Sequence, residues 1–314
     1  MTIVEVRPGL YRLEEPDGRR RLCQYVVVGE ERTLVVDAGL PESPERGLHP
    51  LLSALGWHAR PVVLLLTHPD ADHRGGASVL RDALPQLEVW GHELDRDQLA
   101  DPEVALAERY LAFAASDGVG PPPERVEAMR GRLGRPVRLD RALASDMDLD
   151  LGGRHAQILH MPGHSPGSVV AWLPDESAAL IGDAAMGRGI PFIEGGLMYP
   201  PMYAPPAVYL ETIARLEALG PNLILSGHEP PLEGDDAGRF LAESRAAAHR
   251  LSALVREALV GSRTLAELCA AVNESYGDLP VDGAANMAMT VDGALAELEV
   301  AVDPGPPRRF TRIR

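Results

Sequence analysis

Apolar residues in the first 37 positions come in short runs separated by turn residues, which is the pattern of antiparallel β-strands. Residues 23–28 and 33–36 predict two strands of a hairpin, joined by the polar turn at 29–32. Residues 44–55 change to helical spacing, with leucines recurring on one face. The chain is therefore expected to begin with β-structure and to continue into a helix.

A run of five apolar residues, 62–66, predicts a buried strand, and it ends at a polar stretch. Pro69 has no N–H for a central ladder, so the segment after the run must leave the sheet. Imidazole and carboxylate groups at the end of a buried strand are suited to holding a cation, although a solvated acidic loop is the simpler alternative. The candidate ligands here are His68, Asp70, Asp72 and His73.

Residues 93–145 interrupt the strand pattern with a segment rich in charge and alanine. Two helices are predicted in it, at about 96–115 and 123–132, joined by a loop of glycine and proline. This helical insertion is either a lid over a site or a packed excursion of the core, and the sequence leaves both open. Strands are predicted again at 154–160, 168–173, 178–181 and 222–225, with an irregular stretch at 184–206 and a helix at 207–219.

Three of these later strands end, like the run at 62–66, in a loop that presents histidine or aspartate. The residues are His164, Asp183 and His228. Sites in layered α/β proteins form where the loops at strand ends converge, so we expect these side chains to meet His68 and its neighbours. The seven ligands would suit two cations that share a bridging oxygen, at a separation of about 3.5–4 Å.

Composition narrows the partners and the chemistry. The chain carries 30 basic and 46 acidic residues, a formal net charge of -16, which argues against nucleic acid or an anionic membrane as a partner. No lysine is present, so Schiff-base and P-loop chemistry are excluded. The two cysteines, Cys23 and Cys269, sit in apolar patterns and predict buried free thiols. With no signal-peptide pattern and no run of about 18 apolar residues, we expect a cytoplasmic protein that acts on a small molecule.

The four motifs together resemble those of the metallo-β-lactamase superfamily of metal-dependent hydrolases, over roughly residues 3–232. The resemblance rests on Thr67-His68-x-Asp70-x-Asp72-His73-x-Gly75-Gly76, on Pro162-Gly163-His164-Ser165-Pro166-Gly167-Ser168, on Gly182-Asp183 and on Gly227-His228, in the family's order. It implies an α+β fold in which two mixed sheets face each other with helices outside, a four-layer αβ/βα sandwich. It also implies that residues 1–233 form the catalytic domain.

Carried over position by position, the resemblance implies two metal sites. His68, Asp70 and His164 would hold one metal. Asp72, His73 and His228 would hold the other, and Asp183 would bridge the two. The family usually has histidine at position 70, so the aspartate here is a departure: zinc remains the first expectation, manganese or iron becomes possible with an oxygen ligand, and Asp70 could instead fail to reach the metal.

The function that this resemblance implies is hydrolysis of a small ester, lactone or thioester by a metal-bridging hydroxide that Asp72 orients. The loop at 162–168 is similar to that of glyoxalase II and acyl-lactone members. Tyr199 is a candidate for stabilising the oxyanion or protonating the leaving group, as is Tyr203, and packing of both tyrosines is the alternative. Four other functions stay open: phosphodiester or phosphotriester hydrolysis on the same site, β-lactam hydrolysis, an iron oxidoreductase similar to the flavo-diiron branch, and a binding protein with a degraded site.

Residues 234–314 are predicted to form a second, helical domain. Helices are expected at about 237–260, 264–275 and 284–298, and Thr264 with Glu267 predicts a capping box for the second of them. The segment resembles the small winged-helix-like domain appended to some members of the superfamily. Its third helix carries acidic residues and no arginine, so a packing or substrate-channel role is expected rather than binding of nucleic acid. The sequence leaves a homodimer open.

Overall fold

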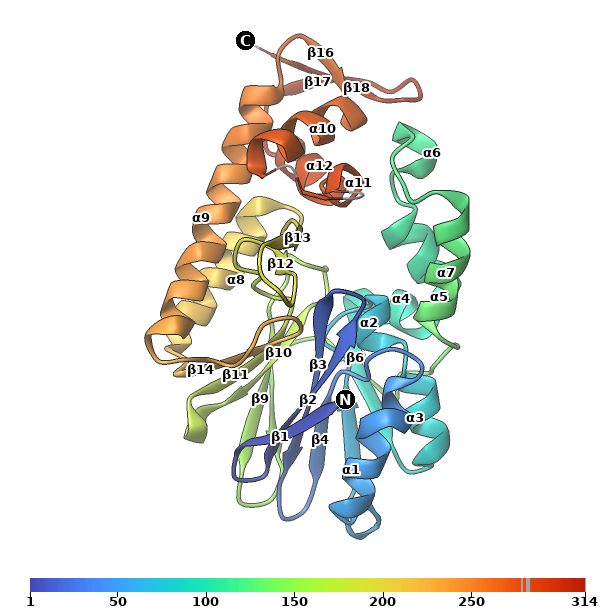
Figure 1. The fold of residues 1–314 in the computed structure, drawn as a ribbon, viewed down its shortest axis with the longest axis vertical. Helices are drawn as coiled ribbons and strands as arrows, with labels where there is room; N and C mark the ends of the chain where they lie inside the picture. The colour runs from blue at the N-terminus through green and yellow to red at the C-terminus, as the bar shows by residue number, and fades with distance from the viewer. Residues whose placement is uncertain (278, 281–282, 314) are drawn as a thin grey trace.

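Two mixed β-sheets lie face to face in the computed structural model, which describes residues 1–277, 279–280 and 283–313 (Figure 1). The seven strands of the first sheet are arranged in chain order. They are β1 (Thr2–Arg7), β2 (Leu10–Asp17), β3 (Arg20–Val28), β4 (Thr33–Val36), β5 (Val62–Leu65), β6 (Glu88–His92) and β7 (Arg141–Leu143). Strands β1 to β4 pair antiparallel and β4 to β7 pair parallel, so β4, β5 and β6 all end at the same edge of the sheet.

The second sheet has six strands in the order β15-β14-β11-β10-β9-β8. Their bounds are β8 (Met147–Asp150), β9 (His155–His160), β10 (Val169–Leu173), β11 (Ala178–Gly182), β14 (Leu223–Ser226) and β15 (Leu232–Glu233). Strands β11 and β14 are parallel neighbours, while the other pairs are antiparallel. The predicted strands of this region are confirmed to within one or two residues.

Strand β5 shows why the sheets stack as they do. Its side chains alternate between the two faces. Val63 and Leu65 pack into the layer between the sheets, and Val62 and Leu64 pack against the outer helices. All four side chains are at most 3% exposed, so the apolar run predicts correctly a strand buried on both sides.

Helices cover the outer faces of the sandwich. Helices α1 (His49–Ala54) and α3 (Ala77–Ala83) lie on the outer face of the first sheet. Helices α8 (Pro206–Leu219) and α9 (Asp235–Ala258) lie on the outer side of the second sheet (Figure 1). The predicted four-layer α+β sandwich is therefore confirmed. Short 3-10 or π-helical turns occupy Pro44–Leu48, Trp57–Ala59, Glu93–Asp95, Leu106–Tyr110 and Pro174–Glu176.

The helical insertion is more broken than the sequence predicts. The single helix expected at 96–115 is wrong, since the chain forms α4 (Arg96–Ala100), α5 (Pro102–Ala105) and α6 (Ala114–Asp117), with a π-helical turn between the last two. Pro102 has no N–H to continue α4, and the side chain of Asp101 caps α5 instead by accepting the N–H of Glu103 at 2.9 Å. The second predicted helix is confirmed as α7 (Pro123–Leu133).

Two loops contain regular structure that the sequence did not indicate. The ligand loop after β5 includes one short helix, α2 (Ala71–Arg74). The stretch expected to be irregular at 184–206 contains the hairpin β12 (Ile190–Pro191) and β13 (Leu197–Tyr199).

The C-terminal segment contains the predicted helices and a small sheet that was not predicted. The helices after α9 are α10 (Leu265–Tyr276), α11 (Gly283–Asn286) and α12 (Ala288–Ala296); the sheet has the order β16 (Ser262–Thr264), β18 (Arg309–Arg312), β17 (Val300–Asp303). The capping box is confirmed: Glu267 N–H donates to Thr264 Oγ1 at 3.2 Å, and Thr264 N–H donates to Glu267 Oε2 at 2.8 Å. Residues 278, 281–282 and 314 of the predicted domain lie outside the described residues.

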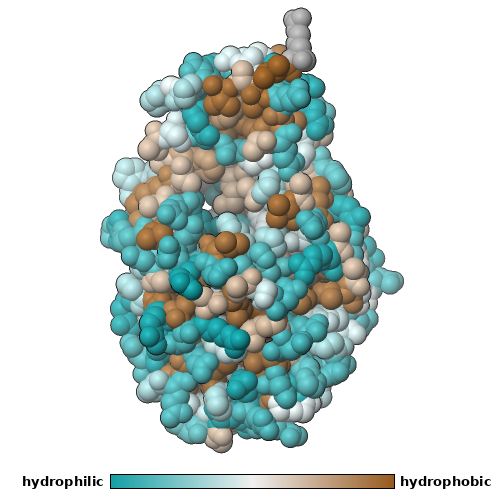
Figure 2. Space-filling model, turned by 180° about the vertical axis from the view of Figure 1, so that it is seen from behind, coloured by the Kyte–Doolittle hydropathy of each residue, from teal (hydrophilic) through white to brown (hydrophobic). Residues whose placement is uncertain are grey.

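The boundary between the two predicted domains crosses a continuous apolar core. One cluster of buried side chains includes Ile213 of α8, Leu251 of α9 and Val291 of α12. The division at 233/234 therefore stays a prediction. On the face seen in Figure 2, apolar side chains gather at the C-terminal end of the molecule, where Val260, Val302 and Ile313 are among the exposed large apolar residues. None of the helices in the described part of the chain has the length and hydrophobicity needed to cross a bilayer.

Arg74 at the end of α2 fastens the insertion to the sandwich. Its side chain is fully buried, and its guanidinium donates to the backbone carbonyls of Leu99, Leu133 and Arg135. Burial lowers the pKa of Arg74 to about 10, so it remains charged at neutral pH.

Replacing Arg74 by methionine leaves these three carbonyls without their donor. We expect the free energy of unfolding to fall by about 2–3 kcal/mol, since unpaired buried carbonyls are costly. Urea unfolding followed by circular dichroism measures the change. Arg138→Met is the matched control: this side chain is 83% exposed and its ion pair with Asp140 contributes little. Equal loss in both variants would contradict the expectation.

Candidate metal centre

Loops at one end of the sandwich bring all seven predicted ligands together, and six of them fall into two compact groups. His68 follows β5, and Asp72 and His73 lie on α2. His164 lies between β9 and β10, Asp183 follows β11, and His228 follows β14. Each of these six side chains is at most 5% exposed. The prediction that the strand ends converge is therefore confirmed for these residues.

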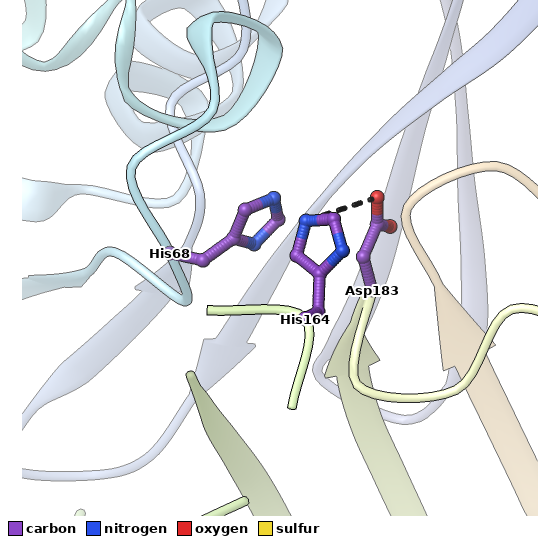
Figure 3. A group of neighbouring side chains, drawn as sticks. All are labelled: His68, His164 and Asp183. Atoms are coloured by element: carbon purple, nitrogen blue, oxygen red, sulfur yellow. Dashed lines mark ion pairs between the residues drawn. The ribbon is translucent and has the colours of Figure 1, made fainter. Parts of the chain in front are cut away.

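The six side chains form two groups of three. His68, His164 and Asp183 make one group (Figure 3), and Asp72, His73 and His228 make the other; within each group the ligand atoms lie within 4.8 Å of one another. The carboxylate of Asp183 also faces the second group: its Oδ2 is 3.3 Å from His228 Nε2 and its Oδ1 is 3.8 Å from His73 Nε2. In Figure 3 the ion pair at 4.0 Å joins Asp183 Oδ2 to His164 Nε2. Asp183 thus lies between the groups, as a bridging ligand must.

Each histidine is anchored through Nδ1 and turns Nε2 toward the centre. His164 Nδ1 donates to the carbonyl of Met202 and His228 Nδ1 to the carbonyl of Arg21, both at 2.8 Å. A carbonyl only accepts, so these two rings carry their proton on Nδ1, and their Nε2 lone pair can accept a hydrogen bond or bind a cation. His73 Nδ1 lies 2.7 Å from Asp37 Oδ2, and His68 Nδ1 lies 2.9 Å from Thr67 Oγ1. Such outer partners are typical of histidines that bind metal.

The donor set fits a divalent cation. The Nε2 atoms of His68, His73 and His228 are buried and have no hydrogen-bond partner within the described residues. Buried polar atoms normally have a partner, and imidazole nitrogens with carboxylate oxygens are ligands that zinc accepts. Burial and the neighbouring His73 and His164 lower the pKa of His68 to about 4, so its ring is neutral and able to coordinate. The chemistry and burial of these side chains therefore fit a divalent cation.

The centre favours positive charge at its middle. Burial acts to lower the pKa of His73, but the carboxylates of Asp37 and Asp183 outweigh it and raise that pKa to about 10. A divalent cation would supply the same positive charge in place of the proton, and ligands must be deprotonated to bind it.

The seventh predicted ligand, Asp70, lies at the first group but is already engaged. Its Oδ2 is 3.0 Å from His164 Nε2 and 3.5 Å from His68 Nε2. The guanidinium of Arg109, from the insertion, holds both of its oxygens, with Nη2–Oδ2 at 2.9 Å, and the hydroxyl of Tyr110 donates to Oδ1 at 3.1 Å. Burial opposes ionisation, but Arg109 holds the pKa of Asp70 well below its usual range. That Asp70 ligates a metal stays a prediction.

Two arginines belong to the site that sequence reasoning missed. Arg109 Nη2 also lies 2.8 Å from His164 Nε2, and Arg20 Nη2 lies 2.8 Å from Asp72 Oδ2 and 2.7 Å from Asp17 Oδ2. Neither arginine stands at a spacing that points to the ligand loop. Asp70 and Asp72 of the ligand loop thus each form an ion pair with an arginine.

The two candidate tyrosines lie in different surroundings. Tyr199 is partly buried and lines a cavity that Asp72 also lines. It is therefore available for the predicted role of stabilising an oxyanion or protonating a leaving group. Tyr203 is fully buried and stacks on Tyr209 with ring centroids 4.2 Å apart. This is the packing alternative, so Tyr203 is not available to a substrate.

Asp37 also belongs to the site, although it is not among the predicted ligands. It has a left-handed backbone, with φ of 63°, at the end of β4. Its carboxylate accepts the N–H of Thr67 at 2.8 Å and the Thr67 hydroxyl at 2.9 Å, besides its contact with His73. Asp37 therefore fixes both the start of the ligand loop and the orientation of the His73 ring.

We expect Asp37→Asn to weaken metal binding by roughly 10–100-fold, the usual cost of removing an outer partner of a metal ligand. The amide keeps the shape but loses the negative charge that holds His73 Nδ1. Competition with a chromogenic chelator measures the affinity. Asp175→Asn, at an exposed turn, is the control, and unchanged affinity in Asp37→Asn would show that the ring is oriented by packing alone.

The fold and the paired ligand groups are those of a metal-binding αβ/βα protein. A family model described as the metallo-beta-lactamase superfamily matches residues 23–228, and the chain belongs to that superfamily. It is 29% identical over 205 residues to a hydroxyacylglutathione hydrolase of Cereibacter sphaeroides, which is 62% of this chain and 61% of that protein. It is 32% identical over 170 residues to an acyl-coenzyme A thioesterase of Gallus gallus, covering 51% of this chain and 57% of that protein. The chain thus spans about three fifths of the length of these relatives.

Solved structures match over a longer part of the chain. A crystal structure of a metallo-beta-lactamase family protein from Thermus thermophilus superposes with a TM-score of 0.73, at 25% identity, over 98% of this chain and 100% of that one. A beta-lactamase domain protein from Burkholderia ambifaria also gives a TM-score of 0.73, at 19% identity, over 99% of this chain and 94% of that one. These likenesses include the C-terminal helices, so the whole described architecture recurs in other proteins.

Proposed function

We propose that this protein is a metal-dependent hydrolase that cleaves a small thioester, ester or lactone. The observation that carries the proposal is the pair of buried ligand groups with Asp183 between them. The names of two relatives, a hydroxyacylglutathione hydrolase and an acyl-coenzyme A thioesterase, both describe thioester hydrolysis. They support the thioester as the first substrate class to test.

His68, His164 and Asp183 would hold one divalent ion and Asp72, His73 and His228 the other, with Asp183 shared and Asp70 a further candidate at the first. When bound, two such ions polarise a carbonyl and lower the pKa of water. Zinc is the first candidate because it accepts both imidazole and carboxylate. Manganese or iron becomes favourable if the Asp70 oxygen also binds.

The chain's own residues orient the reactants. Asp72 would accept a hydrogen bond from the attacking water, and its pairing with Arg20 keeps the carboxylate ionised. Tyr199 would donate its hydroxyl proton toward the carbonyl oxygen or the leaving atom. Water supplies the oxygen of the new C–O bond, the C–S or C–O bond of the substrate breaks, and the departing thiolate or alkoxide takes up the remaining proton.

The test is a substrate panel on protein loaded with zinc or manganese. It contains S-lactoylglutathione, acetyl-coenzyme A, butyl thioesters, p-nitrophenyl esters and a γ-lactone, with bis-p-nitrophenyl phosphate as the competing class. We expect kcat/KM on at least one thioester, ester or lactone to exceed that on the phosphate by more than tenfold. Faster turnover of the phosphate, or no turnover of any acyl substrate, would overturn the proposal.

A further inference from the structure

A cavity of about 210 Å³ lies beside the ligand groups, and several parts of the chain line it, both additions to the sandwich among them. The ligand loop contributes Asp70 and Asp72, the helical insertion contributes residues of 109–132, and the C-terminal segment contributes residues of α11 and α12. Figure 1 shows the insertion and these C-terminal helices facing each other across the top of the sandwich. Both additions to the sandwich therefore form walls of the cavity.

Most of the lining away from the ligand loop is apolar. Phe113, Met129 and Met289 are only partly buried, so their surfaces face the cavity and its solvent. Covering such surfaces with an apolar group removes them from water, which stabilises the complex in proportion to the area covered. Pockets lined in this way, with a few polar groups at the reacting position, are typical of binding sites for apolar ligands. The further apolar lining residues are Val119, Pro121, Met202, Ala285 and Ala288.

Three of the arginines that line the cavity form ion pairs with nearby carboxylates. Arg109 is paired with Asp70, and Arg20 with Asp72 and Asp17. Arg132 shares Asp17, with its Nη2 at 2.6 Å from Oδ2. The fourth arginine at the cavity, Arg125, is also engaged. Because nearby carboxylates offset the guanidiniums of Arg20, Arg109 and Arg132, these three arginines are poorly suited to bind the phosphates of a nucleotide or the carboxylates of a peptide.

We propose that this cavity, the acyl pocket, binds an uncharged apolar acyl chain of the substrate, while the polar alcohol or thiol portion stays outside it. The inference rests on the proposed hydrolysis and specifies its substrate class. Asp70 and Asp72 lie at the ligand groups and also line the acyl pocket, so a chain in the pocket would bring its carbonyl carbon to the ligand groups. Substrates with a chain of several methylenes are then preferred to acetyl or lactoyl substrates.

The first experiment compares N-acetylcysteamine thioesters with unbranched acyl groups of increasing length on the metal-loaded protein. We expect kcat/KM to rise by about fourfold for each added methylene until the pocket is full. The same leaving group throughout the series isolates the contribution of the chain. A flat profile, with at least one thioester still hydrolysed, would overturn the acyl pocket and leave the proposed function intact.

Two variants then test whether the preference for longer acyl chains arises in the acyl pocket. Met289→Trp fills the pocket and is expected to move the optimum to shorter chains, with a loss of at least tenfold on the longest good substrate. Phe113→Ala enlarges the pocket and should move the optimum to longer chains. Ala296→Trp, on an exposed position of the same helix α12, is the matched control and should keep the wild-type profile. An unchanged profile in both pocket variants would contradict the assignment.

A binding measurement separates this inference from the proposed function. Calorimetry with decanamide, which is neutral and carries no scissile ester, should show binding to the metal-loaded wild type, weakened at least tenfold by Met289→Trp but not by Ala296→Trp. Acetamide should not bind measurably. Binding of decanamide by a protein that hydrolyses no acyl substrate would support the pocket and refute the hydrolase. No binding of decanamide to the wild type would refute the pocket.

Discussion

Asp183→Asn is expected to lower kcat/KM on the best acyl substrate by about a thousandfold. Among the described residues, Asp183 is the one carboxylate that faces both ligand groups. Its neighbours hold it ionised: burial opposes the charge, but His228 and His73 bring the pKa of Asp183 well below its usual range. An amide of the same shape loses that charge and binds cations weakly. Loss of several kcal/mol of metal-dependent stabilisation corresponds to a rate change of this order.

Steady-state kinetics and elemental mass spectrometry on the same samples check this prediction. Less than one equivalent of metal per chain in Asp183→Asn, against two in the wild type, would explain the lost activity through lost metal. Asp175→Asn makes the same chemical change at an exposed position and should match the wild type. Wild-type activity in Asp183→Asn would exclude a bridging role.

The second large effect is a loss of stability when Asp70 is replaced. We expect Asp70→His, which installs the residue that the superfamily usually has there, to lower the free energy of unfolding by about 3–5 kcal/mol. The reason is Arg109: its side chain is 7% exposed, and without Asp70 its charge stays buried without its ion-pair partner. A histidine at position 70 can offer a nitrogen to a metal, but it cannot pair with a guanidinium.

The double variant Asp70→His/Arg109→Met separates the two consequences. Removing the charge together with its partner should recover at least half of the lost stability, because the two changes are coupled through one ion pair. Urea unfolding of the wild type, both single variants and the double variant closes the cycle. Additive losses would show that the pair contributes nothing specific. Metal content of the same proteins shows whether Asp70 is needed for two equivalents.

The ligand set could be predicted because it depends on local order. Four of the candidate ligands come within four residues of the end of a strand, so a strand pattern and its end place them without knowledge of the rest of the fold; they are His68, His164, Asp183 and His228. The sandwich follows from the same runs, since residues such as Val63 and Leu64 are apolar on both faces of one strand.

The partners of those ligands could not be predicted because they depend on contacts between distant segments. Arg109 reaches Asp70 from 39 positions away and His164 from 55 positions away. It does so through an insertion whose helices break at positions that amphipathic spacing does not reveal. The C-terminal strands were missed for another reason. Strands β16, β17 and β18 are three or four residues long and mostly exposed, so buried and exposed positions do not alternate in them and give no strand pattern.

The anchoring of His164 and His228 has a consequence for how freely this sequence can vary. Both rings donate to main-chain carbonyls, those of Met202 and Arg21. A carbonyl is present whatever side chain the position carries. Randomising residues 21 and 202 should therefore yield many variants that still assemble the centre, whereas randomising position 37, where a carboxylate does the holding, should yield very few. In directed evolution, the carbonyl-anchored side of the site is the one that can be diversified.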